Sequence, residues 1–451
     1  MHGESPKESH VLHRSREAPA AAVGGHGIRL VLQDGSEVID GSGGAAVACL
    51  GHGNARIAAA IGAQAAKMAY AHTGFFSSEP AEALADTLLG QRPGGLTHAY
   101  FCSSGSEAME AALKLARQYF VEIGQPHRTK VIARRQSYHG NTLGALAAGG
   151  NMMRRAPYTP ILSPAFSHVS PCFAYRFQED GETDEQYLDR LIDELEAEFQ
   201  RLGPEHVIAF CAEPVVGATT GCVAALPGYF ERVRAVCDRH GALLILDEVM
   251  CGMGRTGTMH AWEQEGVTPD IQLVAKGLGA GYAAIGGILI AERVVRAIRA
   301  GSGAFMHGHT YQAHPVACAA ALEVQRIIHE DGLLSNVRAM GAVLEDALNE
   351  RFGNHAHIGD IRGRGLFWAI ELVAEREDKT VFDPTLAMND RVKREALARG
   401  LAVYPMGGTI DGRRGDHVIV APPYIATAGD IMEIVDRLGA AVDAALVSVR
   451  S

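Results

Sequence analysis

Residues 243–257 read LLILDEVMCGMGRTG, in which an apolar run ends in two adjacent carboxylates. The run shows no polar alternation, which is typical of a strand that is covered on both faces in a parallel sheet. Open α/β sheets bind ligands at the carboxyl ends of such strands, so Asp247 and Glu248 would face that crevice. Asp247 is therefore a candidate functional residue, although a carboxylate that only caps the following turn would give the same pattern.

Residues 271–287 read IQLVAKGLGAGYAAIGG, a second apolar run that ends in one lysine followed by glycines. Apolar neighbours lower the pKa of a lysine by desolvation, and the neutral amine is a nucleophile toward aldehydes. Lys276 is thus a candidate nucleophile, whereas a lysine that merely reaches solvent from a strand end is the structural alternative. The glycines at 277–281 lack the GxGxxG spacing of a dinucleotide site, so we do not expect a nicotinamide cofactor.

Residues 101–116 read FCSSGSEAMEAALKLA, which predicts a strand, a turn and an amphipathic helix that begins near Ser104. Free backbone N–H groups and the dipole at a helix N-terminus attract phosphate. The turn at Ser103, Ser104 and Gly105 is therefore a candidate phosphate site. A capping box between Ser104 and Glu107 would explain the same residues without a ligand.

Residues 138–145 read YHGNTLGA and place Tyr138 at another strand end, before a glycine-opened helix. One sheet edge would then hold an anion site, a flat aromatic ring, a carboxylate and a single lysine. Pyridoxal phosphate (PLP) requires this set, because it has a phosphate, a ring that stacks, an aldehyde that a lysine can hold, and a pyridine nitrogen that must stay protonated. We therefore predict a PLP site at this edge.

Short β-rich runs alternate with helical runs from about residue 97 onward, as in HAYFC at 98–102 and VIAFCAEP at 207–214. This order is typical of a mostly parallel α/β sheet. We expect a large PLP-binding domain at 75–325. A smaller α+β domain would combine residues 1–74 with residues 326–451.

The composition excludes several other classes of protein. The chain has 451 residues, of which 47% are hydrophobic and 21% are charged, as in ordinary globular proteins. Its net charge of −11 has the wrong sign for binding nucleic acid or an anionic membrane. No apolar run approaches the roughly 18 residues of a membrane span, and no signal-peptide core is visible. The eight cysteines show no CxxC and no zinc spacing, so we expect no metal site and a cytoplasmic location.

The chain resembles the class III aminotransferases, a subgroup of the fold type I PLP enzymes that includes ornithine, 4-aminobutyrate and ω-amino acid:pyruvate transaminases. The resemblance runs from about residue 28 to residue 440. It rests on seven pieces in order: SSGSEAMEAALKLAR, YHGNTLGAL, AEPVVGATTG (212–221), LLILDEVMCGMGRTG, PDIQLVAKGLGAGY, HGHTYQAHPVACAAAL (307–322) and VIVAPPYIAT (418–427). It implies a mostly parallel seven-stranded sheet in the large domain, and a homodimer or tetramer with active sites at the dimer interface.

Carried over to the matching positions, the resemblance implies catalytic roles for two residues. Lys276 would hold the cofactor covalently and later move the substrate proton, and Asp247 would pair with the pyridine nitrogen. The resemblance also implies contacts to the cofactor ring and phosphate by Tyr138, Ser104, Gly105, Ser106 and, in a neighbouring subunit, Thr310.

Two departures from the family pattern bear on the substrate. Ornithine and 4-aminobutyrate transaminases have Gln after DEV, where this chain has Met250, and Glu in a motif like EPVQGEGG, where this chain has Ala218. Both changes are similar to ω-transaminases that use pyruvate as acceptor and bind a carboxylate through a flexible arginine. Arg413 and Arg414 are the candidates for that arginine, and we favour Arg414. Phe76 would shape the substrate pocket.

We therefore predict a transaminase that moves an amino group from an amine or ω-amino acid, such as a diamine, diaminobutyrate or a β-alanine-like compound, to a 2-oxo acid, with pyruvate favoured. A decarboxylase, racemase or aminomutase is the first alternative, because PLP stabilises any α-carbanion. A non-catalytic PLP-binding regulator is the second. Amino transfer with ping-pong kinetics distinguishes the transaminase from both.

Overall fold

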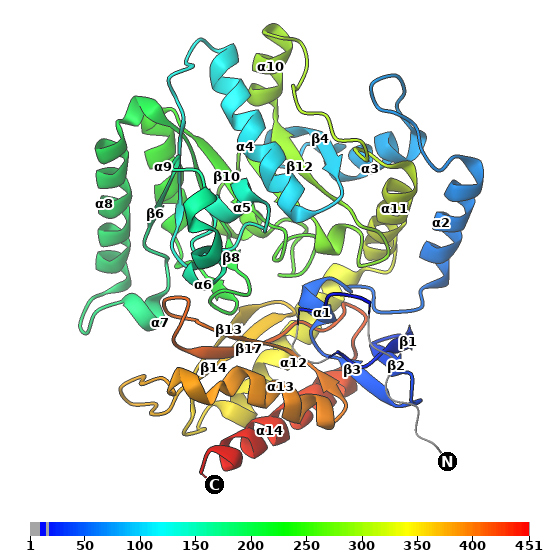
Figure 1. Ribbon diagram of the computed structural model, residues 1–451, viewed down its shortest axis with the longest axis vertical. Coiled ribbons are helices and arrows are strands. Elements are labelled where there is room, and N and C mark those ends of the chain that lie inside the picture. The colour runs from blue at the N-terminus through cyan, green and yellow to red at the C-terminus, as the bar shows by residue number, and fades with distance from the viewer. Residues whose placement is uncertain (1–9, 15–17, 451) are drawn as a thin grey trace.

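The computed structural model describes residues 10–14 and 18–450 (Figure 1). Its main sheet has seven strands in the order β4-β12-β11-β10-β7-β5-β6. Strand β12 runs antiparallel to both of its neighbours, and the other pairs are parallel. The predicted α/β class with a mostly parallel seven-stranded sheet is confirmed. The strands are β4 (Leu96–Cys102), β5 (Lys130–Arg134), β6 (Phe166–Val169), β7 (Val207–Ala212), β10 (Leu243–Asp247), β11 (Ile271–Val274) and β12 (Gly286–Ala291).

Both faces of this sheet are covered by helices, which explains why its central strands are apolar without alternation. In β10, Leu243 and Ile245 enter the core on one face, and Leu244 and Leu246 enter the core on the other. Each such buried side chain contributes about 1.5–3 kcal/mol. The covering helices include α4 (Gly105–Glu122) and α10 (Glu292–Ala300) on the first face, and α3 (Glu79–Leu89), α8 (Asp184–Leu202) and α9 (Tyr229–His240) on the second (Figure 1).

The two ends of the chain come together below the main sheet as it is drawn in Figure 1. One four-stranded sheet has the order β1-β2-β3-β15, so that N-terminal strands pair with a strand near residue 401. A second has the order β13-β14-β17-β16. These strands are β1 (Ala22–His26), β2 (Arg29–Leu32), β3 (Glu37–Asp40), β13 (Ile358–Arg364), β14 (Phe367–Leu372), β15 (Leu401–Ala402), β16 (Tyr404–Gly407) and β17 (Asp416–Val420).

Helices from both ends pack against these sheets and share one apolar core with them. Helix α11 (Pro315–Glu330) is continuous across the expected boundary between residues 325 and 326. The division into 1–74, 75–325 and 326–451 stays a prediction. The other elements are α1 (Gly43–Ala46), α2 (Ala55–Lys67), α5 (Leu143–Ala148), α6 (Met152–Arg155), α7 (Ala174–Phe177), α12 (Leu333–Phe352), α13 (Met388–Ala398), α14 (Ala428–Arg450) and the hairpin β8 (Val215–Val216) and β9 (Val223–Ala224).

A buried ion triad ties α7 to the C-terminal sheet. Glu371 is fully buried, and its carboxylate lies 2.5 Å from Arg176 Nε and 2.6 Å from Arg362 Nη1. Removing one member of such a cluster leaves an uncompensated buried charge, which costs far more than the net value of the intact cluster.

Three further features concern membrane spans, metal sites and disulfides. Within the part of the chain that the structure describes, no helix is long and apolar enough to cross a bilayer. The same residues contain no group of His, Cys, Asp and Glu side chains that could hold a metal ion. All eight cysteines are buried free thiols.

Candidate active site

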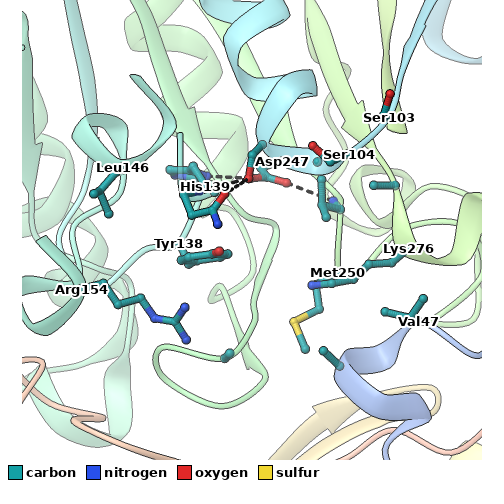
Figure 2. A pocket seen from close by; sticks show the side chains of 18 of the residues that line it. Val47, Ser103, Ser104, Tyr138, His139, Leu146, Arg154, Asp247, Met250 and Lys276 are labelled. Carbon is teal, nitrogen blue, oxygen red and sulfur yellow. Dashed lines mark hydrogen bonds and ion pairs between the residues drawn. The ribbon is translucent and has the colours of Figure 1, made fainter. Parts of the chain in front are cut away.

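A cavity of about 790 Å³ lies at the carboxyl ends of the parallel strands of the main sheet. Figure 2 shows Tyr138, Asp247 and Lys276 around its interior. The chain reaches this cavity from segments far apart in sequence because parallel strands all end at one edge. The cavity lining includes six residues singled out from the sequence: Ser104, Gly105, Ser106, Tyr138, Asp247 and Lys276.

Lys276 follows β11 and lies in a short 3-10 turn. Its φ of 40° is in the left-handed region, a conformation that costs of order 1–3 kcal/mol for a residue with a side chain and that often marks a functional site. Burial of the ammonium group lowers the pKa of Lys276, and the negative charges of Asp247 and Glu213 only partly oppose this effect. The neutral, nucleophilic amine is therefore more populated than in a free lysine.

Asp247 is held in place by His139, which comes from the loop after β5. His139 Nδ1 lies 2.8 Å from Asp247 Oδ2, and the other carboxylate oxygen accepts a hydrogen bond from Val249 N at 3.0 Å. Burial acts to lower the pKa of His139, but Cys211 and the hydrogen bond to Asp247 together raise it well above its ordinary value. The raised pKa favours the protonated imidazole of His139, and the hydrogen bond keeps the side chain of Asp247 in a fixed orientation.

The N-terminus of α4 offers donors for an anion. Ser104 Oγ accepts a hydrogen bond from Glu107 N at 3.2 Å, which leaves its hydroxyl proton free to be donated. Glu107 Oε2 in turn accepts from Ser103 N at 2.7 Å, so the expected capping box is displaced by one residue. Among the described residues, no acceptor is found for the amide N–H groups of Gly105 and Ser106. They are the orphan donors of an 18-residue helix, and they point to an anion.

Gly140 allows the loop after β5 to approach this helix end closely. Its φ is 131°, and a Cβ atom at this position would lie 2.6 Å from Ser106 Oγ. The contact brings Asn141 N to within 3.0 Å of the same hydroxyl oxygen. A residue with a side chain at position 140 would push the two walls of the anion site apart.

Tyr138 projects into the cavity from the same loop (Figure 2). Its backbone N donates to Glu213 Oε1 at 3.1 Å, and Glu213 Oε2 accepts from Gly217 N at 2.9 Å. The guanidinium of Arg154 lies over the Tyr138 ring, with Cζ 4.6 Å from the ring centroid. Arg154 could not be predicted from the sequence, because it belongs to no motif and only the fold brings α6 to the cavity.

Other predicted residues lie outside this cavity of the single chain. Arg414 has 60% of its side chain exposed, and its Nε lies 2.7 Å from Asp411 Oδ2 in the same loop. Phe76 is 66% exposed and lines a separate cavity of about 250 Å³. Thr310 is also exposed, and its carbonyl oxygen accepts a hydrogen bond from Tyr70 at 3.0 Å. Arg413, the alternative to Arg414, is exposed in the same loop.

The residues present fit PLP in both charge and shape. The unpaired N–H groups at the start of α4 match a phosphate, and the fixed carboxylate of Asp247 matches a protonated ring nitrogen. The amine of Lys276, with its lowered pKa, matches an aldehyde. Met250 and Ala218, which replace the Gln and Glu of other transaminases, both line the same cavity.

Fold and site together define a PLP-dependent transferase of the α/β type, and comparison with known proteins identifies the family. The model of the family described as "Aminotransferase class-III" matches residues 11–442. The chain belongs to this family. It is an enzyme, a transferase, and its cofactor is PLP, as the sequence predicted.

Three similar proteins illustrate the relationship. The chain is 49% identical to an uncharacterized aminotransferase of Schizosaccharomyces pombe over 96% of this chain and 95% of that protein. It is 36% identical to the hypotaurine/taurine–pyruvate aminotransferase of Paracoccus denitrificans, over 96% and 92%. The crystal structure of the ω-transaminase from Pseudomonas jessenii in complex with PMP superposes with a TM-score of 0.92 at 32% identity, over 98% of this chain and 97% of that chain.

Proposed function

We propose that this aminotransferase moves an amino group from an amine or ω-amino acid to pyruvate in two half reactions. The observation that carries this assignment is the lining of the cavity by Met250 and Ala218 beside Lys276. A Glu at position 218 could form an ion pair with a carboxylate-binding arginine and keep that arginine away from the substrate, whereas Ala218 cannot form such a pair. The similarity to the Paracoccus hypotaurine/taurine–pyruvate aminotransferase and to the Pseudomonas ω-transaminase supports the same assignment.

We assign the following roles to the residues of the cavity. Bound PLP supplies an electron sink that stabilises negative charge on the substrate carbon. Asp247, braced by His139, keeps a negative charge beside the ring nitrogen so that this nitrogen stays protonated. Tyr138 packs against the ring. Ser104, Gly105 and Ser106 bind the phosphate through the α4 N-terminus.

Lys276 is the nucleophile and the proton carrier in this proposal. Its amine has a lowered pKa, so it can hold the cofactor aldehyde and, once displaced by a donor amine, accept the proton from the substrate carbon. Lys276 would return to its neutral amine by passing that proton to the cofactor; water would then release the donor as a carbonyl compound, and the amino group would stay on the cofactor for the acceptor. Because the acceptor binds only after that product has left, the kinetics are ping-pong.

We propose that the enzyme is a homodimer or a tetramer in which Thr310 and Phe76 complete the cavity of a second copy. This proposal is supported by the exposure of Phe76 and Thr310 in the single chain and by large apolar side chains exposed near them. Phe75 is 79% exposed, Met306 80% and Tyr311 57%. Apolar groups of this size at the surface commonly mark a protein interface. Sedimentation velocity distinguishes monomer, dimer and tetramer.

We also propose that the enzyme works in the cytoplasm. The proposal is supported by the eight buried free thiols, since disulfides are rare in reducing compartments. The net charge of −11 disfavours nucleic acid and anionic membranes as partners. The partners in this account are an amine donor, a 2-oxo acid acceptor and further copies of the chain. Microscopy of the tagged full chain tests the location.

A panel of donors tests the reaction. Diamines, diaminobutyrate, β-alanine and an arylalkyl amine are each offered with pyruvate or 2-oxoglutarate as the acceptor, and the new amino acid is measured. We expect alanine to form with pyruvate at a higher kcat/KM than glutamate forms with 2-oxoglutarate. Release of CO₂, or recovery of an isomerised amine without transfer to any acceptor, would contradict the proposal and favour the decarboxylase, racemase or aminomutase.

A further inference from the structure

Two arginines that line the cavity have no part in the cofactor contacts proposed above. Two of its acidic side chains are already engaged: Asp247 pairs with His139, and Glu213 accepts hydrogen bonds from Tyr138 N and Gly217 N. Besides Lys276, two guanidinium groups line the cavity, those of Arg14 and Arg154. Within the described residues, 10–14 and 18–450, no carboxylate lies within ion-pair distance of Arg154.

Arg154 is oriented into the cavity by its own short helix. Asn151 caps α6 and accepts a hydrogen bond from Arg154 N at 3.1 Å. The next residue, Arg155, points elsewhere and donates to Gly149 O at 2.7 Å. Arg154 instead stacks over Tyr138, and Figure 2 shows its guanidinium on the side of Tyr138 that faces away from Asp247.

Stacking leaves the donors of Arg154 available. A guanidinium contacts an aromatic ring through its flat face, whereas its N–H groups point outward in its plane and can bind a carboxylate with two parallel hydrogen bonds. Arg154 and Lys276 line the same cavity, and the positive charge of Arg154 adds to the effect of burial in lowering the pKa of Lys276. An anion bound at Arg154 would therefore lie in the same cavity as the reacting amine.

We propose that Arg154, rather than Arg414, binds the carboxylate of the substrate. This inference rests on the proposed transaminase function and deepens it. Arg414 is 60% exposed and paired with Asp411, whereas Arg154 has no anionic partner among the described residues and lines the cavity. The preferred donors are then amino acids whose carboxylate is remote from the reacting amine, and the same arginine receives the carboxylate of the 2-oxo acid.

Paired donors test the assignment. The variant Arg154→Gln is compared with Arg414→Gln, a matched loss of one charge, using 4-aminobutyrate and n-butylamine as donors with the holoenzyme. Hydrogen bonds to charged groups contribute about 1.5–3 kcal/mol, which corresponds to about 10- to 150-fold in kcat/KM. We expect Arg154→Gln to lose this factor with 4-aminobutyrate and to change less than about threefold with n-butylamine. Arg414→Gln should leave both values near those of the wild type.

A binding measurement separates this inference from the proposed function. Butyrate carries the carboxylate but no amine, so its dissociation constant can be measured by calorimetry without turnover. We expect Arg154→Gln to weaken butyrate binding by at least tenfold and Arg154→Lys to restore part of it. Equal loss with both donors, or a loss confined to Arg414→Gln, would overturn the assignment. If the wild type transferred no amino group from any donor, the proposed function would fail, and the butyrate result would still decide the role of Arg154.

Discussion

Replacing His139 with Asn tests how Asp247 is held. His139 is only 2% exposed; its Nδ1 lies 2.8 Å from the Asp247 carboxylate and its Nε2 lies 3.8 Å from Cys211 Sγ. A buried hydrogen bond between charged partners contributes about 1.5–3 kcal/mol. We therefore expect His139→Asn to lower kcat by about 10- to 150-fold, because Asp247 would lose its orientation and part of its charge stabilisation. The KM for the donor should change little, since His139 does not face the substrate.

Single-turnover kinetics with the PLP-loaded protein measure this effect directly, and the dissociation constant of PLP should rise in parallel. His168→Asn is the control, since His168 is a half-buried histidine of strand β6 that donates to Ala148 O at 3.0 Å and does not contact Asp247. The reasoning would be refuted if His139→Asn kept more than half of the wild-type kcat with an unchanged affinity for PLP. It would be refuted equally if His168→Asn produced the same loss.

Three further predictions concern stability and the anion site. Glu371→Gln removes the charge that compensates Arg176 and Arg362, so the free energy of unfolding in urea should fall by about 3–5 kcal/mol, whereas the exposed Glu375→Gln should change it by less than about 0.5 kcal/mol. Burial raises the pKa of Glu248 to about 8, from an ordinary value near 4.5, so the folded state binds its proton more tightly. This contribution to the free energy of unfolding is complete below pH 4.5 and is lost as the pH rises toward 8, by at most about 5 kcal/mol. In thermal melts at a series of pH values, Glu248→Gln should therefore remove this part of the dependence of stability on pH. Gly140→Ala should weaken PLP binding at least tenfold in equilibrium dialysis, since its Cβ would lie 2.6 Å from Ser106 Oγ; unchanged affinity would show that the loop does not shape the phosphate site.

Some residues of the site could be predicted from the sequence, because the pattern of the residues next to them shows where each lies in a strand or helix. Asp247 and Lys276 each end an apolar run, and Ser104 begins an amphipathic helix, so each could be placed at the edge of a parallel sheet. Because the carboxyl ends of parallel strands meet, residues from separate motifs were expected to share one cavity. The structure places them around that cavity.

Contacts between side chains from distant segments could not be predicted in this way. Nothing in the sequence around Arg154 indicates that α6 turns this side chain over Tyr138. Nor does it show that Asp411 pairs with Arg414, three residues away, and holds it outside the cavity. The hydrogen bond between His139 and Asp247 likewise depends on how two loops meet, and hydrophobic periodicity carries no information about that.

Reduction with borohydride tests the central claim most directly, that Lys276 anchors the cofactor. The reagent converts a lysine that holds the PLP aldehyde into a stable secondary amine, which is then located by peptide mass spectrometry. We expect the purified, PLP-loaded chain to carry the modification on Lys276 and Lys276→Ala to lose both the label and its visible absorbance. A label on another lysine, or a wild-type protein that stays colourless and unlabelled after loading, would contradict the account.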